Sequence, residues 1–141
     1  MSQTICILNK LDEIEKVAQA LSTFGKIHGI AAETVDEIRL ALDEIITNII
    51  SYGYVDKRDH PIEVLLDMSN KAAVLEIKDN ARPFNPLQMP LPETSVPFDE
   101  RDVGGLGIFI ARSVMDEITY RFVNGHNILT MKKHVRSDRK K

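Results

Sequence analysis

Five of the six prolines of this 141-residue chain lie between Arg82 and Pro97. Proline fixes φ and lacks a backbone N–H, so this stretch can form neither a regular helix nor a central β-strand. Long loops without secondary structure are uncommon inside compact domains and are mostly functional lids or disordered segments. The regular elements must therefore lie before and after this stretch, and the stretch itself is a candidate lid.

Strands and two helices are predicted before the proline-rich stretch. The clearest element is a helix with Thr34 as its cap, because the apolar residues from Val35 to Ile49 form one stripe at helical spacing. Apolar spacing also predicts an earlier helix, and β-branched or alternating residues predict three strands. These elements are the strand Thr4 to Leu8, the helix Lys10 to Phe24, and the strands Ile62 to Met68 and Ala72 to Lys78.

A helix and two strands are predicted after the stretch. The helix runs from Leu106 to about Asp116, and Asn124-Gly125 is a strong hairpin signal between strands Ile118 to Phe122 and Asn127 to Lys133. Strands that are neighbours in sequence are thus joined as hairpins. The order β-α-α-β-β-loop-α-β-β predicts an α+β fold, a two-layer sandwich with helices on one face of a mixed, mostly antiparallel sheet. This order does not fit a doubly wound parallel sheet.

Composition favours a single soluble domain. A hydrophobic fraction of 43% is too high for a disordered chain, and no apolar run approaches the roughly 20 residues of a membrane-spanning helix. The N-terminus lacks the basic start of a signal peptide, so we expect a cytoplasmic protein. A net charge of −3 argues against direct nucleic-acid binding. We expect one domain over residues 1–135, a disordered basic tail over 136–141, and Cys6 as a small core residue.

Two polar residues on the second predicted helix form the first candidate site. Glu44 and Asn48 stand one turn apart, and each is flanked by a pair of isoleucines. A partly buried carboxylate and carboxamide need partners, which a magnesium ion or a polar ligand would provide. The alternative is that both residues face water and mark only the wet side of the helix.

Two further features are each ambiguous on their own. Gly104-Gly105-Leu106-Gly107 opens a helix, where glycines allow the close approach of a ligand and free backbone N–H groups attract phosphate. A flexible joint explains this run equally well. Asp79 ends a predicted strand, where its carboxylate can accept a hydrogen bond from an exocyclic amine such as that of adenine. A strand-terminating Asp-Asn turn is the alternative.

The order of these features is more specific than any one of them. A helix with Glu-x-x-x-Asn, a strand ending in Asp, a proline-rich lid and Gly-Gly-Leu-Gly opening a helix resembles the GHKL ATPases. Within them, the chain is most similar to the stand-alone bacterial anti-sigma factor serine/threonine kinases. Residues 40–54, 75–86 and 104–131 carry the resemblance, which covers nearly all of the chain from Ile5 to Lys133. It implies a histidine kinase-like ATP-binding domain, of the Bergerat fold, over residues 1–135.

The resemblance also implies roles for individual residues. Asn48 looks like the magnesium ligand that holds the ATP phosphates, Glu44 like the general base, and Asp79 like the carboxylate that reads the adenine amino group. The other positions implied for the nucleotide site are Ala81, Phe84, Gly104, Gly105, Leu106 and Gly107.

Ala81 departs from the family pattern, which usually places glycine there. If a positive φ or a close approach of the nucleotide requires that glycine, Ala81 weakens binding, although an extra methyl group can also be tolerated. Arg82 and Arg101 are candidates for phosphate contact, and the alternative for both is an exposed charge on the lid.

The implied function is that of an ATP- and Mg²⁺-dependent serine/threonine kinase that is also an anti-sigma factor. Such a protein sequesters a sigma factor, phosphorylates a STAS-type anti-anti-sigma antagonist and forms a homodimer. Ala81 leaves open a second function, a nucleotide-dependent partner-binding module without phosphotransfer. A third function, an ATP-binding subunit serving a phosphoacceptor histidine on another chain, is disfavoured because no phosphoacceptor helix is predicted.

Overall fold

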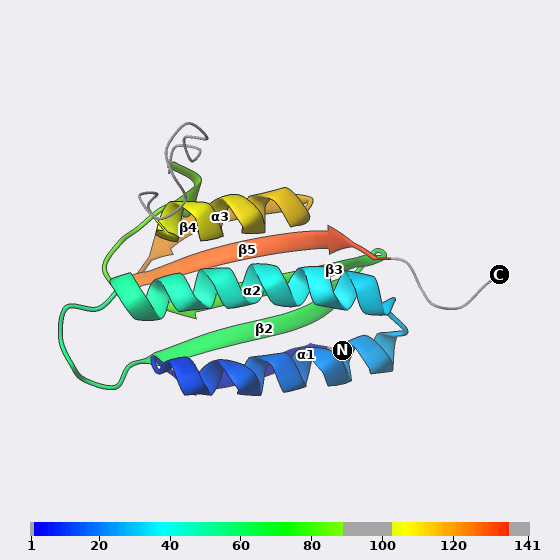
Figure 1. Cartoon of the computed structure of the whole chain (residues 1–141), viewed down its shortest axis with the longest axis horizontal. Coiled ribbons are helices and arrows are strands. Elements are labelled where there is room, and N and C mark those ends of the chain that lie inside the picture. The colour runs from blue at the N-terminus through cyan, green and yellow to red at the C-terminus, as the bar shows by residue number, and fades with distance from the viewer. Residues whose placement is uncertain (1, 89–102, 136–141) are drawn as a thin grey trace.

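The computed structural model describes residues 2–88 and 103–135, which form one β-sheet packed against helices (Figure 1). The strands are β1 (Gln3–Leu8), β2 (Pro61–Ser69), β3 (Ala72–Asp79), β4 (Glu117–Val123) and β5 (His126–His134). The helices are α1 (Ile14–His28), α2 (Ala32–Tyr52) and α3 (Val103–Val114), with short 3₁₀ turns η1 (Leu11–Glu13) and η2 (Pro86–Gln88). Residues 89–102 of the predicted lid and the predicted tail 136–141 lie outside the described residues.

The sheet has the strand order β1-β2-β3-β5-β4, and all of its pairings are antiparallel. The turn between β2 and β3 places Asn70 and Lys71 at φ 49° and 64°. The predicted Asn-Gly hairpin joins β4 to β5, with Asn124 at φ 51° and Gly125 at φ 80°. Positive φ at both central residues is the conformation that a tight hairpin turn requires. In the register between β3 and β5, Asp79 lies opposite Asn127.

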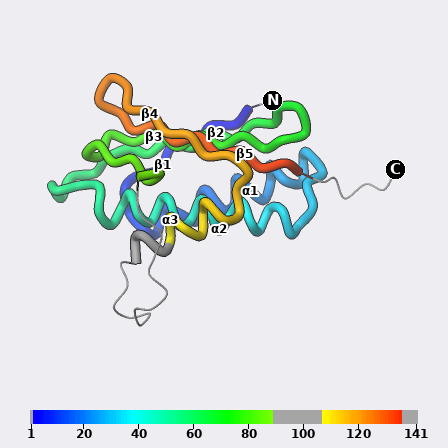
Figure 2. The backbone as a smooth tube through the Cα atoms, turned by 90° about the horizontal axis from the view of Figure 1, so that it is seen from above, coloured from blue at the N-terminus to red at the C-terminus, as the bar shows by residue number. Residues whose placement is uncertain are grey.

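The helices cover one face of the sheet, as Figure 2 shows. Apolar side chains from the helices and from alternate positions of the strands fill the space between the two layers. The fully buried core includes Ile7, Val17, Leu21, Phe24, Ile38, Leu42, Ile46, Ile62, Leu66, Leu75, Ile77 and Met131. This confirms the predicted two-layer α+β sandwich, with a sheet that is antiparallel throughout. None of the helices in the described ranges is long and apolar enough to cross a membrane.

The helix boundaries differ from the predicted ones where tertiary packing overrides local signals. α1 continues through Gly25 to His28 and ends at Gly29, whose φ of 64° is the left-handed conformation that favours glycine. A Cβ on Gly25 would lie 2.7 Å from Cγ2 of Val35, so this glycine allows α1 and α2 to pack closely. α2 begins at Ala32, and Thr34 is therefore not its cap.

The prediction that Cys6 is a core residue is wrong. Successive side chains of a strand point to opposite faces of the sheet. In β1, Ile7 is buried, whereas Cys6 is exposed. Cys6 stands between two isoleucines that point toward the helices, so its own side chain points to the opposite face of the sheet. The described helices do not cover that face.

Candidate functional site

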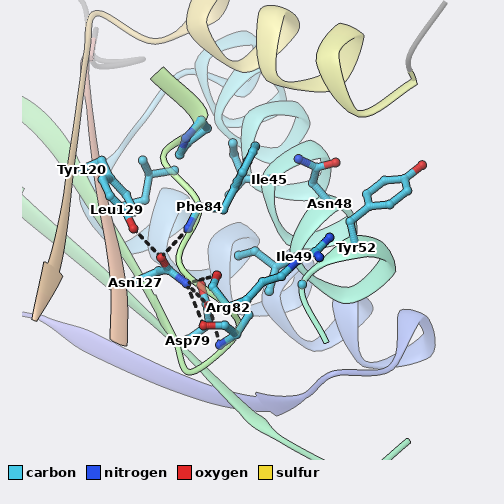
Figure 3. Close-up of a pocket in the computed structure, with 13 residues that line it drawn as sticks. Ile45, Asn48, Ile49, Tyr52, Asp79, Arg82, Phe84, Tyr120, Asn127 and Leu129 are labelled. Atoms are coloured by element: carbon cyan, nitrogen blue, oxygen red, sulfur yellow. Dashed lines mark hydrogen bonds between the residues drawn. The ribbon is translucent and has the colours of Figure 1, made fainter. Parts of the chain in front are cut away.

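A cavity of about 270 Å³ lies between the C-terminal half of α2 and the ends of β3, β4 and β5 (Figure 3). Its walls are mainly apolar and aromatic, with a few polar groups, which is typical of small-molecule sites. The lining residues are Ile45, Asn48, Ile49, Tyr52, Gly53, Asp79, Ala81, Arg82, Phe84, Pro86, Tyr120, Asn127 and Leu129. The structure thus brings together the predicted site residues Asn48, Asp79, Ala81 and Phe84, which come from α2 and from the end of β3.

Asp79, the last residue of β3, is only 4% exposed. Its Oδ1 accepts hydrogen bonds from the Ala81 backbone N–H at 2.9 Å and from Nδ2 of Asn127 at 3.0 Å. None of the described residues donates a hydrogen bond to Oδ2. Burial raises the pKa of Asp79, while the two hydrogen bonds and the charge of His126 act in the opposite direction. A buried carboxylate with a free oxygen is suited to accept a hydrogen bond from a ligand N–H.

Asn127 is a residue of this site that the sequence patterns did not single out. Its Nδ2 donates to Oδ1 of Asp79 and to the backbone carbonyls of Ala81 and Arg82, at 3.0, 3.2 and 3.0 Å. Its Oδ1 accepts hydrogen bonds from the Phe84 N–H at 3.1 Å and from the Tyr120 hydroxyl. A polar residue in phase with buried Leu129 and Met131 was an available signal, since alternation places all three on the covered face.

Ala81 fits the loop without strain. It does not have a positive φ, so its backbone has no need of glycine. A Cβ on Gly53 would lie 2.8 Å from the Ala81 methyl group, so Gly53 at the end of α2 leaves the room that this methyl group occupies. The Arg82 N–H donates to the Gly53 carbonyl at 3.1 Å, which ties the loop to the end of α2.

Glu44 and Asn48 are both half-buried on α2, one turn apart. Asn48 lines the cavity, whereas Glu44 lies beside it, against α3. A Cβ on Gly107 would collide with Oε2 of Glu44, so Gly107 allows this carboxylate to sit between the two helices. The sequence-based alternative that Glu44 and Asn48 simply face water does not fit these positions.

The remaining predicted positions are only partly described. Gly104, Gly105 and Leu106 belong to the first turns of α3, which begins at Val103 rather than at Leu106, and their surroundings lie outside the described part of the structure. Arg101 also lies outside it, and Arg82 lines the cavity. Among the described residues, no group of three His, Cys, Asp or Glu side chains could hold a metal ion. Mg²⁺ bound to nucleotide phosphates needs only one or two protein ligands, and the Asn48 carboxamide oxygen is of the type it prefers.

Comparisons with known proteins identify the family to which this chain is similar. The sequence profile of the histidine kinase-like ATPase domain matches residues 7–133. The serine/threonine-protein kinase BtrW of Bordetella bronchiseptica is 28% identical over 97 residues, which cover 69% of this chain and 68% of that protein. The serine-protein kinase RsbW of Listeria monocytogenes is 24% identical over 119 residues, covering 80% of this chain and 74% of that protein.

A solved structure supports the fold independently. The RsbU and RsbW domains of a Mycobacterium tuberculosis protein superpose with a TM-score of 0.70 at 12% identity, over 96% of this chain. The chain spans 32% of that longer protein. Because the family profile covers nearly the whole described structure, the chain belongs to the histidine kinase-like ATPase domain family.

Proposed function

We propose that this protein is an ATP-dependent serine/threonine-protein kinase that binds Mg-ATP in the cavity beside Asp79. The observation that carries the proposal is the buried Asp79 carboxylate, whose Oδ2 is free of hydrogen bonds from the described residues and borders an apolar cavity. Such a group reads an exocyclic amine, and the walls formed by Ile49, Phe84 and Leu129 suit the faces of a purine.

The phosphate end of the nucleotide would extend along α2 toward α3. Asn48 would hold the magnesium ion, which when bound neutralises charge on the phosphates. Glu44, one turn away, would accept the proton of the attacking serine or threonine hydroxyl. The hydroxyl oxygen then forms a bond to the γ-phosphorus as the bond to the ADP oxygen breaks. Gly104, Gly105, Leu106 and Gly107, with the positive end of the α3 dipole, would lie near the phosphates.

The protein partners belong to the same proposal. The similarity to the kinases BtrW and RsbW supports a protein substrate, which we propose to be a STAS-type anti-anti-sigma protein. We further propose that the protein sequesters a sigma factor, forms a homodimer and acts in the cytoplasm on proteins rather than on nucleic acid. The domain would extend over residues 1–135, and 136–141 would be a separate basic tail.

Transfer of labelled phosphate from ATP to a purified STAS-type protein tests the kinase assignment. Glu44→Gln should reduce the transfer rate about 100-fold or more, because a general base contributes an acceleration of that size, and should leave ATP affinity nearly unchanged. Glu37→Gln is the matched control, because Glu37 lies on the same helix, 3.7 Å from Lys133 Nζ and outside the cavity. Transfer by the Glu44→Gln variant at the wild-type rate would contradict the assigned role.

The alternative is a nucleotide-dependent partner-binding module without phosphotransfer, for which Ala81 in place of glycine is the specific argument. The fit of Ala81 against Gly53 weakens that argument, because the methyl group has room in the loop. Calorimetry with ATP and ADP distinguishes the two functions when it is combined with the transfer assay. Nucleotide binding without transfer to any STAS-type partner would favour the alternative.

A further inference from the structure

We propose that Asn127 is a positioning residue of the nucleotide site, which holds Asp79 and the loop root (Ala81–Phe84) as one unit with the free carboxylate oxygen turned to the ligand. This inference rests on the proposed function. The loop root contains the start of the proline-rich stretch, where the chain leaves β3. Asn127 therefore connects the Asp79 carboxylate to the start of that stretch.

The first argument is that Asn127 has no hydrogen-bonding capacity left for a ligand. Its two N–H groups serve three acceptors, and its carbonyl oxygen accepts two hydrogen bonds. A carboxamide offers two donors and two lone pairs, so the side chain is saturated. It is also only 7% exposed. Asn127 therefore acts on the nucleotide through its neighbours.

The second argument concerns the position of Asp79. Asn127 lies directly opposite Asp79 in the register of β3 and β5, and its N–H occupies Oδ1. The Ala81 N–H occupies the same oxygen. Both donors therefore fix the rotation of the carboxyl group and leave Oδ2 for the ligand (Figure 3). Without the Asn127 donor, Asp79 would keep one of these two constraints. The loop root would lose the hydrogen bonds of its Ala81 and Arg82 carbonyls to β5.

The third argument is electrostatic. The hydrogen bond from Asn127 lowers the pKa of Asp79 against the larger effect of burial, and so favours the ionised carboxylate that can accept from an amine. The other groups near Asp79 are His126, whose charge acts in the same direction, the phenols of Tyr120 and Tyr54, and Arg82 of the loop root. Unlike these groups, Asn127 donates a side-chain hydrogen bond to the Asp79 carboxylate.

The substitution Asn127→Asp tests this role because it keeps the shape and the acceptor oxygen but removes the donors. Two carboxylates would then face each other in a buried site, where they share a proton at low pH and repel each other when both ionise. A shared proton can replace the lost N–H, so the variant should bind ATP best in acid. Its affinity relative to the wild type should fall at least about tenfold between about pH 6 and pH 9.

Asn124→Asp is the matched control, because it adds the same charge in the exposed turn of the same hairpin. Its affinity relative to the wild type should not change with pH. Thermal melts of the ligand-free variants provide a second measurement, in which Asn127→Asp should lose stability relative to the wild type as the pH rises. This second measurement does not depend on nucleotide binding.

The possible outcomes are separable. An affinity ratio for Asn127→Asp that falls with pH, with a flat ratio for Asn124→Asp, supports the inference. A ratio that is unchanged, or equally reduced at every pH, overturns it, since a merely structural loss would not follow the titration of a carboxylate pair. If the wild type binds no ATP at any pH, the proposed function fails and the positioning role fails with it.

Discussion

At the scale of single residues, the buried and ionised Asp79 carboxylate lowers the free energy of unfolding of the ligand-free protein. Burial raises its pKa, which means that ionising it in the folded state is harder than in the unfolded chain. Hydrogen bonds from Asn127 and Ala81 offset only part of this effect. Ionisable groups whose pKa is shifted by burial in a cavity are candidates for functional sites. The unfavourable burial is therefore better explained by ligand recognition than by folding.

The first prediction concerns Asp79→Asn. Because the folded pKa is raised, the favourable contribution of the protonated group is present below the ordinary aspartate pKa of 3.8 and is lost as the pH rises through the folded value. At neutral pH the neutral asparagine should therefore stabilise the ligand-free protein by about 1 kcal/mol, or raise its Tm by about 3 °C. Differential scanning calorimetry from acid to neutral pH measures this gain.

The same variant should lose ATP binding, because the asparagine side chain can present a donor to the adenine amino group where Asp79 presents an acceptor. Nucleotides with a 6-oxo group should be bound better relative to ATP than by the wild type. Asp59→Asn is the control for the charge change, since the Asp59 side chain is 57% exposed beside Lys10. A ligand-free Asp79→Asn protein that is less stable than the wild type at neutral pH would contradict the burial argument.

At the scale of elements, the sequence was sufficient to predict a helix or a strand wherever one hydrophobic periodicity ran without interruption. The stripe from Val35 to Ile49 and the alternation in Ile62 to Met68 predicted α2 and β2 within a few residues. The sequence was misleading at Gly25, which lies inside α1 rather than after its end. At Gly25 the reason is the close packing of Val35 from another helix, which no local pattern contains.

The candidate site, like the secondary structure, was predictable from the sequence only in part. Asn48 and Asp79 each stand at a position that local patterns mark, namely a polar residue in an apolar helix and the end of a strand. Asn127 was missed because its role depends on the pairing of β3 with β5, which are separated in sequence by α3 and β4. Strand order is a property of the tertiary structure, so hydrogen bonds that cross the sheet could not be read from one sequence.

The second prediction concerns the contact between α2 and α3. Gly107→Ala should favour the helix by up to about 1 kcal/mol, because glycine is a poor helix former. The added methyl group would, however, displace the Glu44 carboxylate, which is the flexible end of that side chain. We expect the transfer rate to fall by about tenfold or more, in line with the loss of a positioned general base, while thermal stability stays the same or rises.

Ser113→Ala provides the control for this effect, since Ser113 is exposed on the same helix and its hydroxyl donates to the Phe109 carbonyl. It should improve helix propensity without altering the transfer rate. Phosphotransfer assays and thermal melts on both variants separate activity from stability. If Gly107→Ala transfers phosphate as fast as the wild type, the position of Glu44 against α3 does not matter for catalysis.

At the scale of the whole molecule, the candidate site lies between the two layers, at the end where α2, β3 and β5 meet (Figures 1 and 3). α2 contributes Asn48, and the sheet contributes Asp79 and Asn127, so a ligand in the cavity would touch both layers. A ligand that binds only the folded state stabilises it in proportion to the logarithm of its concentration. Nucleotide binding should therefore be visible as a shift in global unfolding.

The last prediction uses this coupling to test Asn48. ATP at about 100 times its Kd should stabilise the wild type by about 2.7 kcal/mol, or about 8 °C in Tm, and by less when magnesium is chelated. Asn48→Ala should remove the magnesium-dependent part of this shift and keep the magnesium-independent part, because Asp79 still reads the base. Thr47→Ala, at the exposed neighbouring position of α2, should keep both parts. An undiminished magnesium-dependent shift in Asn48→Ala would mean that the ion is held without this carboxamide, and the ligand role would pass to other residues.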